Sequence, residues 1–305
     1  MDVSIIIINY NTKTLLKQCL RSVFEQTKGL EFEAIVVDNA SVDGSQEMLK
    51  NEFPCVNLIE NGENSGFGRA NNLGVEKASG KYLFLLNSDT ILQNNAVKIL
   101  FDFLENNPKA GICCGNLFNE NEQPSHSYFM YLSPFFRELD LFFAGILQKM
   151  IFGKNATFNY TEKPRKIGDP TAADLMIRAD LFRKVGGFDS DFFIYGEDRH
   201  LNFKVKKMKY EMYNVPQAKI IHLDGKSANT NINRLIMIRK GTNLYYKKTL
   251  NKCMISACRA LFFLMIYSRL NYFKLKGDKE KCELWRALLE NEKNTITDAE
   301  NYLFS

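Results

Sequence analysis

The chain has 305 residues, of which 45% are hydrophobic and 25% are charged, and its formal net charge is +5. This composition is typical of a soluble globular protein with either one α/β domain and an appendage or two domains. The basic residues are spread along the chain until its C-terminal third, so we expect no nucleic-acid-binding surface, and an anionic ligand or a membrane surface is the better match.

Cysteine usage and hydropathy indicate the compartment. The seven cysteines form no CxxC pair, which predicts reduced thiols in a cytosolic protein instead of a disulfide framework or a zinc site. Residues 3–8 lead directly into a strand, so we expect no signal peptide. No run reaches about 18 uninterrupted apolar residues, so we expect no transmembrane helix.

Strands and helices are predicted to alternate through residues 1–107. Apolar runs rich in β-branched residues predict the strands, and apolar residues on one helical face predict the helices between them. The predicted strands cover residues 3–8, 34–37, 56–59 and 81–86. Strict alternation predicts right-handed crossovers and a parallel sheet.

The fourth predicted strand ends abruptly in Asn87, Ser88 and Asp89. In open α/β sheets, ligands bind at the carboxyl ends of the strands. A carboxylate flanked by amide and hydroxyl oxygens suits a hard divalent cation that also binds phosphate oxygens and water. The alternative is structural, with Asp89 or Thr90 as the N-cap of a helix predicted at residues 92–104.

Two other strand ends carry candidate ligand contacts. Asp38 follows the second strand, where an acidic residue commonly contacts a ribose or a base, and the alternative is an Asx turn. Gly66 and Gly68 allow either a close approach of backbone amides to phosphate or only a turn. No GxGxxG follows the first strand and no Walker lysine is present, so dinucleotide-binding and P-loop folds are excluded.

The pattern changes after Pro108 and predicts a region with antiparallel strands. Further strands are predicted at residues 112–118, 127–131, 172–177, 210–215 and 219–223. An apolar helix with a wide arc is predicted at residues 135–152, followed by a mobile polar loop at 153–166. Another helix is predicted to begin at residues 196–198, and residues 231–305 are predicted to be helical and basic.

Six segments together resemble the family-two glycosyltransferases with a GT-A fold, most of all the rhamnosyltransferase-like, non-processive branch. They follow the order and spacing of that family and cover residues 3–12, 36–45, 64–72, 85–90, 182–198 and 221–227. The resemblance implies an α/β GT-A fold, the Rossmann-like fold of nucleotide-diphospho-sugar transferases, with a mostly parallel central sheet. It implies a GT-A domain at 1–230, with a nucleotide-binding half (1–107) and an acceptor half (108–230), and a helical C-terminal extension at 231–305.

The resemblance also implies inverting transfer from a nucleotide-diphospho-sugar donor, either dTDP-rhamnose or a UDP- or GDP-sugar, with Mn²⁺ or Mg²⁺ on the diphosphate. The residues that match the donor-binding positions are Asn9, Tyr10, Asp38, Asn64, Gly66, Arg69, Asn71 and Ser88. Asp89 and His222 match the metal ligands, and Asp198 matches the general base for the acceptor hydroxyl. Glu197 and Asp174 are the next candidates on the acceptor side.

Several of these positions have a second interpretation or depart from the family pattern. His222 is alternatively a strand-end histidine with a satisfied hydrogen bond. Asp198 is alternatively the N-cap of its helix, and we expect the helix N-terminus to hold the pKa of this carboxyl down. Asn87 replaces the first Asp of the DxD motif. His200 replaces an Asp and either shapes the acceptor pocket or faces solvent, and Asp174 replaces a small or apolar residue and is alternatively a surface position.

The expected reaction adds one sugar to a carbohydrate or lipid-linked glycan in cell-surface polysaccharide synthesis. We expect a single addition because the QxxRW motif of processive synthases is absent. One rival is a catalytically silent nucleotide-sugar-binding subunit of a glycan assembly complex, and the presence of both Asp89 and Asp198 disfavours it. A second rival, a sugar nucleotidyltransferase, requires a Gly-rich basic loop after the first strand, and residues 9–12 have neither property.

Two apolar segments, residues 135–152 and 254–273, have Lys or Arg at their margins, as interfacial helices do. We therefore expect a cytoplasmic protein that lies peripherally on the inner face of the cell membrane. The alternative is that these segments pack on the domain or form a homodimer interface.

Overall fold

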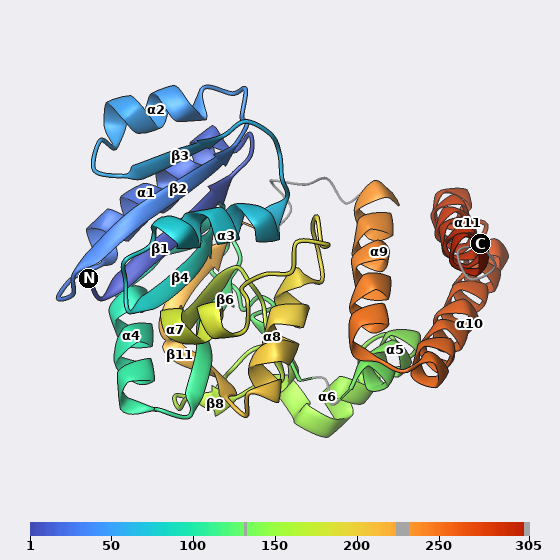
Figure 1. The fold of residues 1–305 in the computed structure, drawn as a ribbon. Helices are drawn as coiled ribbons and strands as arrows, with labels where there is room; N and C mark the ends of the chain where they lie inside the picture. The colour runs from blue at the N-terminus through green and yellow to red at the C-terminus, as the bar shows by residue number, and fades with distance from the viewer. Residues whose placement is uncertain (131–132, 224–231, 302–305) are drawn as a thin grey trace.

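The computed structural model describes residues 1–130, 133–223 and 232–301, with side chains up to residue 294. An α/β domain contains the N-terminus, and three long helices form a separate layer beside it that contains the C-terminus (Figure 1). These helices are α9 (Ile232–Thr249), α10 (Lys252–Lys276) and α11 (Lys279–Asn301).

Within the described residues, nine strands form one mixed sheet in the order β3-β2-β1-β4-β10-β6-β11-β5, with β8 paired to β11. The strands are β1 (Val3–Asn9), β2 (Phe32–Asn39), β3 (Asn57–Asn61), β4 (Tyr82–Asn87), β5 (Thr90–Leu92), β6 (Ala110–Phe118), β8 (Arg165–Lys166), β10 (Asp174–Arg178) and β11 (Glu211–His222). Strands β1 to β4 are parallel, as are β6 and β11, whereas β10 is antiparallel to β4 and β6. The expected α/β fold with a mostly parallel central sheet is confirmed.

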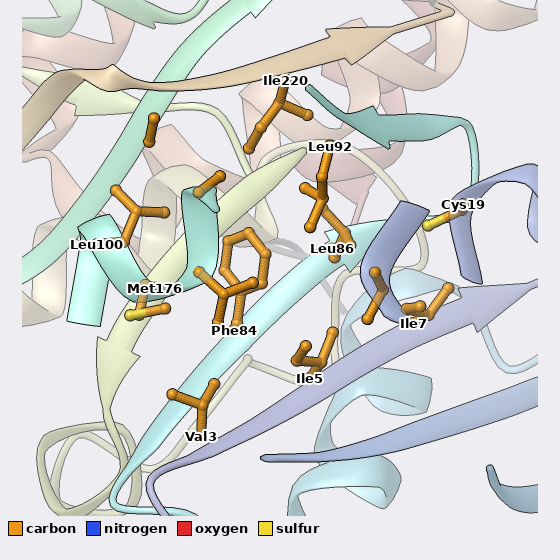
Figure 2. Close-up of a cluster of buried hydrophobic side chains, with 14 of the residues drawn as sticks. Val3, Ile5, Ile7, Cys19, Phe84, Leu86, Leu92, Leu100, Met176 and Ile220 are labelled. Atoms are coloured by element: carbon orange, nitrogen blue, oxygen red, sulfur yellow. The ribbon is translucent and has the colours of Figure 1, made fainter. Parts of the chain in front are cut away.

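Helices cover both faces of the sheet because β1 and β4 are apolar on both faces. The covering helices are α1 (Lys13–Gln26), α2 (Ser45–Glu52), α3 (Phe67–Lys77), α4 (Ala96–Asn106), α7 (Ala179–Lys184) and α8 (Glu197–Lys207). On one face, Ile5, Ile7 and Phe84 pack with residues of α1 and α4 (Figure 2). Residues of α2 belong to the same core. On the other face, Ile6 and Leu85 pack with residues of α3, α7 and α8. Alternate residues of one strand therefore belong to two cores.

The segment after β4 differs from the sequence prediction. Thr90–Leu92 forms the short strand β5, and α4 begins only at Ala96. β5 pairs with the end of β11, so that Thr90 lies opposite His222. The N-cap interpretation of Asp89 and Thr90 is therefore wrong, because long-range pairing replaces the first turn of the predicted helix.

Three strand predictions beyond residue 107 are also corrected. The strands predicted at 210–215 and 219–223 are one strand, β11, whose pairing with β6 shifts register between Asn214 and Lys219. Pro216 lies inside this shift, where its missing N–H removes a hydrogen bond of the ladder. The strand predicted at 127–131 is reduced to β7 (Tyr128–Phe129), which pairs with β9 (Asp169–Pro170), and residue 131 lies outside the described residues.

The region 135–166 is more structured than the sequence suggests. It contains α5 (Pro134–Phe142), α6 (Ile146–Phe152) and the 3₁₀ helix η1 (Gly153–Ala156). The predicted single helix is broken because Ala144 and Gly145 both adopt positive φ. The predicted mobile loop instead buries Phe158 and Asn159, and the Asn159 carbonyl accepts a hydrogen bond from the Asn116 side chain.

The C-terminal helices are joined to the rest of the molecule by packing and by a buried ion cluster. α10 contacts α5 and α11, and α9 contacts α8 and α11. The guanidinium of Arg239 in α9 donates hydrogen bonds to Glu138 of α5 at 2.8 Å and to Glu292 of α11 at 3.0 Å. All three side chains are almost completely buried, so this cluster fixes three helices to one another.

α10 is long and apolar enough, by length and composition only, to cross a membrane. The sequence expectation of no transmembrane helix depended on uninterrupted apolar runs, and Arg259 and Arg269 interrupt this one. Only 22% of its most apolar window is buried inside the molecule. Core helices of soluble proteins pass the same test of length and composition, so a membrane span is not assigned.

Candidate functional site

A cavity of about 400 Å³ opens at the carboxyl ends of the parallel strands. Tyr10 follows β1, Asn39 ends β2 and Asn87 ends β4, and all three line the cavity. Residues 171–173 and 193–195, from the chain beyond residue 107, complete the wall. This is the edge at which open α/β sheets bind ligands.

The predicted donor-binding residues divide into two groups. Tyr10, Asn64, Gly66 and Ser88 line the cavity. The remaining predicted residues, which do not line it, are Asn9, Asp38, Arg69 and Asn71. The hydrogen bonds of this second group show that they support the cavity wall.

Asn9 and Asp38 form a fully buried pair beneath the wall. Asn9 Nδ2 donates to Asp38 Oδ1 at 2.6 Å. The second carboxylate oxygen of Asp38 accepts from Gln46 Nε2 at 2.7 Å and from the Ser41 backbone N–H at 3.0 Å. The carboxylate therefore holds the loop after β2 beside the end of β1, as the turn interpretation of Asp38 anticipates. Direct contact with a ribose or base stays a prediction.

Arg69 and Asn71 support the wall from α3. Asn71 Nδ2 donates to the Phe67 carbonyl at 3.0 Å, within the first turn of the helix. Arg69 Nε donates to the Ser190 carbonyl at 2.8 Å, which links α3 to the segment before α8. Both side chains therefore position cavity-lining segments without lining the cavity themselves.

The segment 193–195 is held between α3 and α9. Gly66 precedes α3 with φ of 85°, and a Cβ at this position would collide with the Phe193 carbonyl. The same carbonyl accepts a hydrogen bond from the Phe67 N–H at 3.0 Å. On the other side, a Cβ on Gly241 of α9 would collide with the Tyr195 carbonyl. Glycine at both positions permits this close approach of backbone to backbone.

Asp89 and His222 are brought together by the pairing of β5 with β11. His222 Nε2 lies 3.3 Å from Asp89 Oδ1, and both side chains are mostly buried and line the cavity. In the part of the chain that the structure describes, no cluster of three or more His, Cys, Asp or Glu side chains is placed to hold a metal. A divalent ion at this pair would depend on substrate phosphates and water for its other ligands, as Mg²⁺ usually does. Residues 224–227 of the matching segment lie outside the described residues.

Glu197 and Asp198 form the first turn of α8 and line the cavity. The N-cap position belongs to Gly196, and Asp198 Oδ1 accepts the Arg199 N–H at 2.7 Å. The N-cap interpretation of Asp198 is therefore wrong.

The pKa values of these two carboxyl groups are raised. Burial raises the pKa of Asp198, the charge of Asp169 adds to the effect, and Arg199 opposes it. Burial also raises the pKa of Glu197, and the neighbouring Asp198 charge adds to it. The expectation that the helix N-terminus holds the pKa of Asp198 down is wrong, because the loss of hydration outweighs the backbone N–H groups.

Asp174 is fully buried at the start of β10, so its interpretation as a surface residue is wrong. Its Oδ2 accepts the Gly115 N–H at 2.6 Å, and burial raises its pKa well above the usual value. Ala172 and Ala173 line the cavity, whereas Asp174 does not. A role as the acceptor-side base therefore has no geometric support.

His200 neither faces solvent nor lines the cavity. Its ring lies between Phe192 and Phe203, and its Nδ1 is 3.3 Å from Asp189 Oδ2. Burial and the charge of Lys204 lower its pKa. The residue therefore packs the back of α8, and both interpretations from the sequence are corrected.

Sequence reasoning gave no role to Phe193, Ile194, Tyr195 or Arg234, which also line the cavity. Arg234 Nε donates to the Tyr195 hydroxyl at 3.2 Å, so α9 contributes to the site. Phe193 and Tyr195 lie in segment 182–198, which matches the family. Their position next to Glu197 could have predicted that they line the site. Arg234 had no such signal, because only the tertiary packing of α9 brings it to the cavity.

The family model described as glycosyl transferase family 2 matches residues 4–186, which is more than half of the chain. The chain belongs to glycosyl transferase family 2. The resemblance on which the sequence predictions rest is therefore confirmed at the level of the family.

Two curated relatives of this family 2 glycosyltransferase have related activities in their names. Glycosyltransferase GlyG of Streptococcus pneumoniae is 28% identical over 130 residues, which cover 42% of this chain and 42% of GlyG. The chain thus matches less than half the length of that relative. N-acetylglucosaminyl-diphospho-decaprenol L-rhamnosyltransferase of Mycobacterium tuberculosis is 24% identical over 238 residues, covering 72% of this chain and 75% of the relative.

The solved structures agree on the fold. The mannosyltransferase PcManGT of Pyrobaculum calidifontis, in complex with GDP-Man and Mn²⁺, superposes with a TM-score of 0.59 at 18% identity. The superposition covers 99% of this chain and 80% of PcManGT. At this low identity the likeness shows the GT-A fold alone.

Proposed function

We propose that this family 2 glycosyltransferase moves one sugar, with inversion, from a nucleotide-diphospho-sugar to a hydroxyl of a carbohydrate or lipid-linked glycan. The observation that carries the proposal is that Asp89, His222 and Asp198 line one cavity at the ligand edge of the sheet. The transfer needs positive charge on the leaving diphosphate and a base on the acceptor hydroxyl. The cavity offers groups suited to both tasks.

The nucleotide side of the donor would lie against the ends of β1, β2 and β4. Tyr10 is half-exposed and offers a ring face for stacking on a base, while Asn39 and Asn64 present amide groups to the cavity. The names of similar proteins support the donor class, since PcManGT is described with GDP-Man and the mycobacterial relative as an L-rhamnosyltransferase. We therefore propose dTDP-rhamnose or a UDP- or GDP-sugar.

Asp89 and His222 would hold Mn²⁺ or Mg²⁺ together with the donor diphosphate. The pair fits such an ion because a carboxylate oxygen and an imidazole nitrogen lie 3.3 Å apart on the cavity wall. Asn87 adds an amide to the same wall in place of a second carboxylate. A bound ion supplies Lewis-acid stabilisation of the negative charge that develops on the diphosphate.

Asp198 would act as the base. Its carboxylate takes the proton of the acceptor hydroxyl while that oxygen bonds to the anomeric carbon of the donor sugar. The bond from this carbon to the diphosphate oxygen breaks, and its electron pair leaves with the nucleoside diphosphate. The raised pKa makes Asp198 a stronger base than an ordinary aspartate.

The metal role is tested by comparing wild-type and Asp89→Ala protein with a panel of nucleotide-sugars. We expect Asp89→Ala and EDTA-treated wild type both to lose donor turnover, because each removes positive charge from the diphosphate. The melting temperature of Asp89→Ala should stay near that of the wild type. Full turnover in EDTA would contradict the metal role, and a wild-type chain that binds a donor without any turnover would support the silent-subunit alternative.

We also propose that neighbouring helices bind the surface of an anionic membrane. Met150 of α6 and Leu275 of α10 are 76% and 90% exposed, and α5 contacts both helices. α10 contains five Lys or Arg and no Asp or Glu. In α5 the only acids, Glu138 and Asp140, are buried. The two helices α5 and α10 thus add basic but no exposed acidic side chains to this apolar surface, and the acids Asp278 and Glu280 come only after α10 ends. The basic excess matches anionic lipid headgroups.

Flotation with phosphatidylglycerol vesicles tests this surface. We expect the wild-type chain to float and the Met150→Ser and Leu275→Ser double variant to float much less. The control is Val42→Ser, since Val42 is 90% exposed in the nucleotide-binding half. If the wild type stays at the bottom of the gradient and light scattering shows a dimer, the homodimer alternative replaces the membrane.

A further inference from the structure

A second cavity, of about 270 Å³, lies beside the candidate active site. Met237, Lys240, Gly241 and Leu244 form one wall, and their spacing places them on one face of α9. Residues 191–194 form the opposite wall. We call this cavity the α9 pocket.

The α9 pocket and the candidate active site share a wall. Phe193 and Ile194 line both cavities, so one stretch of chain separates them. The wall is thin because Gly241 lets the backbone of α9 approach the Tyr195 carbonyl directly. The same stretch continues into Asp198, so the pocket lies against the segment that leads to the proposed base.

The chemistry of the α9 pocket is apolar with one cation. Phe193 and Met237 are partly exposed and offer apolar surface. Asp191, the acidic residue of the pocket, is paired with Lys248 at 2.6 Å. In the described part of the chain no carboxylate forms an ion pair with Lys240, which leaves its ammonium for a ligand. An apolar cavity with one lysine favours an amphiphile whose apolar group lies next to a phosphate.

We propose that the α9 pocket is an acceptor subsite, which binds the apolar group and the adjacent phosphate of a lipid-phosphate-linked sugar. The sugar hydroxyl of this acceptor then enters the first cavity near Asp198. The inference rests on the proposed function and narrows its acceptor from any glycan to a phosphate-bearing amphiphile. α9 also carries Arg234, six residues before Lys240, so the helix presents a cation to each cavity.

The binding test uses n-decyl phosphate as the probe, kept below its micelle concentration and titrated into the full chain. Two reference ligands separate the contributions: n-decyl β-glucoside lacks the negative charge, and inorganic phosphate lacks the apolar chain. We expect both references to bind at least roughly tenfold more weakly, because each loses one of the two complementary interactions. Equal binding of the glucoside would overturn the role of Lys240, and no binding of decyl phosphate would overturn the subsite.

Matched variants locate the probe in the pocket. Lys240→Gln removes the charge and Met237→Trp fills the apolar space, and each should weaken decyl phosphate binding by roughly tenfold. Lys247→Gln is the control for charge on the same helix. Met208→Trp is the control for size, since Met208 and Met237 are 37% and 36% exposed. The controls should bind like the wild type, and pocket variants that also do so would overturn the proposal.

Donor binding distinguishes a failure of the α9 pocket as an acceptor subsite from a failure of the proposed function. Thermal shifts with the nucleotide-sugar panel should be the same for all four variants as for the wild type, because the donor lies across the shared wall. If the wild type neither binds nor turns over any donor, while Lys240→Gln still abolishes decyl phosphate binding, the proposed transferase reaction fails and the pocket stands.

Discussion

Burial, more than the helix N-terminus, sets the acidity of the two carboxyl groups that begin α8. Both Glu197 and Asp198 have a raised pKa, and each is affected by neighbouring negative charge. Carboxyl groups this close release their protons as a coupled pair. The site therefore holds a base of raised proton affinity next to a carboxyl group that keeps its proton to higher pH.

The pH dependence of the transfer rate follows from the raised pKa of Asp198. The base acts only when deprotonated, so kcat/KM should fall as the pH drops through this pKa, clearly above the value of about 3.9 for an ordinary aspartate. Asp169→Asn removes a negative charge that raises the pKa and should move the acid limb to lower pH. Asp169 also contacts Arg199 and Asn202, so the melting temperature of the variant must be measured alongside. An acid limb that stays in place or moves to higher pH would count against Asp198 as the base.

At the scale of elements, α9 is a structural part of the candidate site even though it lies beyond residue 230, where a separate extension was predicted. Its Arg234 lines the cavity, and its Gly241 rests against the chain that leads to Asp198. The buried cluster of Arg239 with Glu138 and Glu292 fixes α9 to α5 and α11. Removing one member of such a cluster typically leaves a buried charge unpaired, so the extension is expected to matter for activity as well as stability.

Gly241→Ala tests the packing of α9 against the segment 193–195. The new Cβ would collide with a backbone carbonyl, which cannot move aside as a flexible side chain does. We expect a loss of about 1–3 kcal/mol in the free energy of unfolding and a lower transfer rate. Gly62→Ala is the control, because nothing lies within 4 Å of a Cβ at that position. A Gly241→Ala variant with wild-type stability and rate would show that this contact is unimportant.

At the scale of the whole molecule, the fold of residues 1–107 was predictable because its signals are local. Each of the strands β1 to β4 is an apolar run followed by polar residues, and each helix between them shows one apolar face. Strand ends of a parallel sheet meet at one edge, so Asn87, Ser88 and Asp89 could be placed at the site from the sequence. The family resemblance added Tyr10, Asn64, His222 and Asp198.

The rest of the site depends on contacts between distant parts of the chain. β5 is only three residues long and exists because it pairs with β11, which no local pattern indicates. Asp38 and Asn71 are turned into the wall by hydrogen bonds that a sequence does not specify. The positions of Tyr195 and Arg234 follow from the packing of α9.

The most direct test of the account is the turnover of Asp198→Asn. Asparagine has nearly the same shape and can still accept the Arg199 N–H, yet it cannot take a proton from a hydroxyl. We predict that donor binding and melting temperature stay at wild-type values while the transfer rate falls by roughly 10²–10⁴. A variant that transfers sugar at nearly the wild-type rate would contradict the account and move the role of base to another residue, with Glu197 the next candidate.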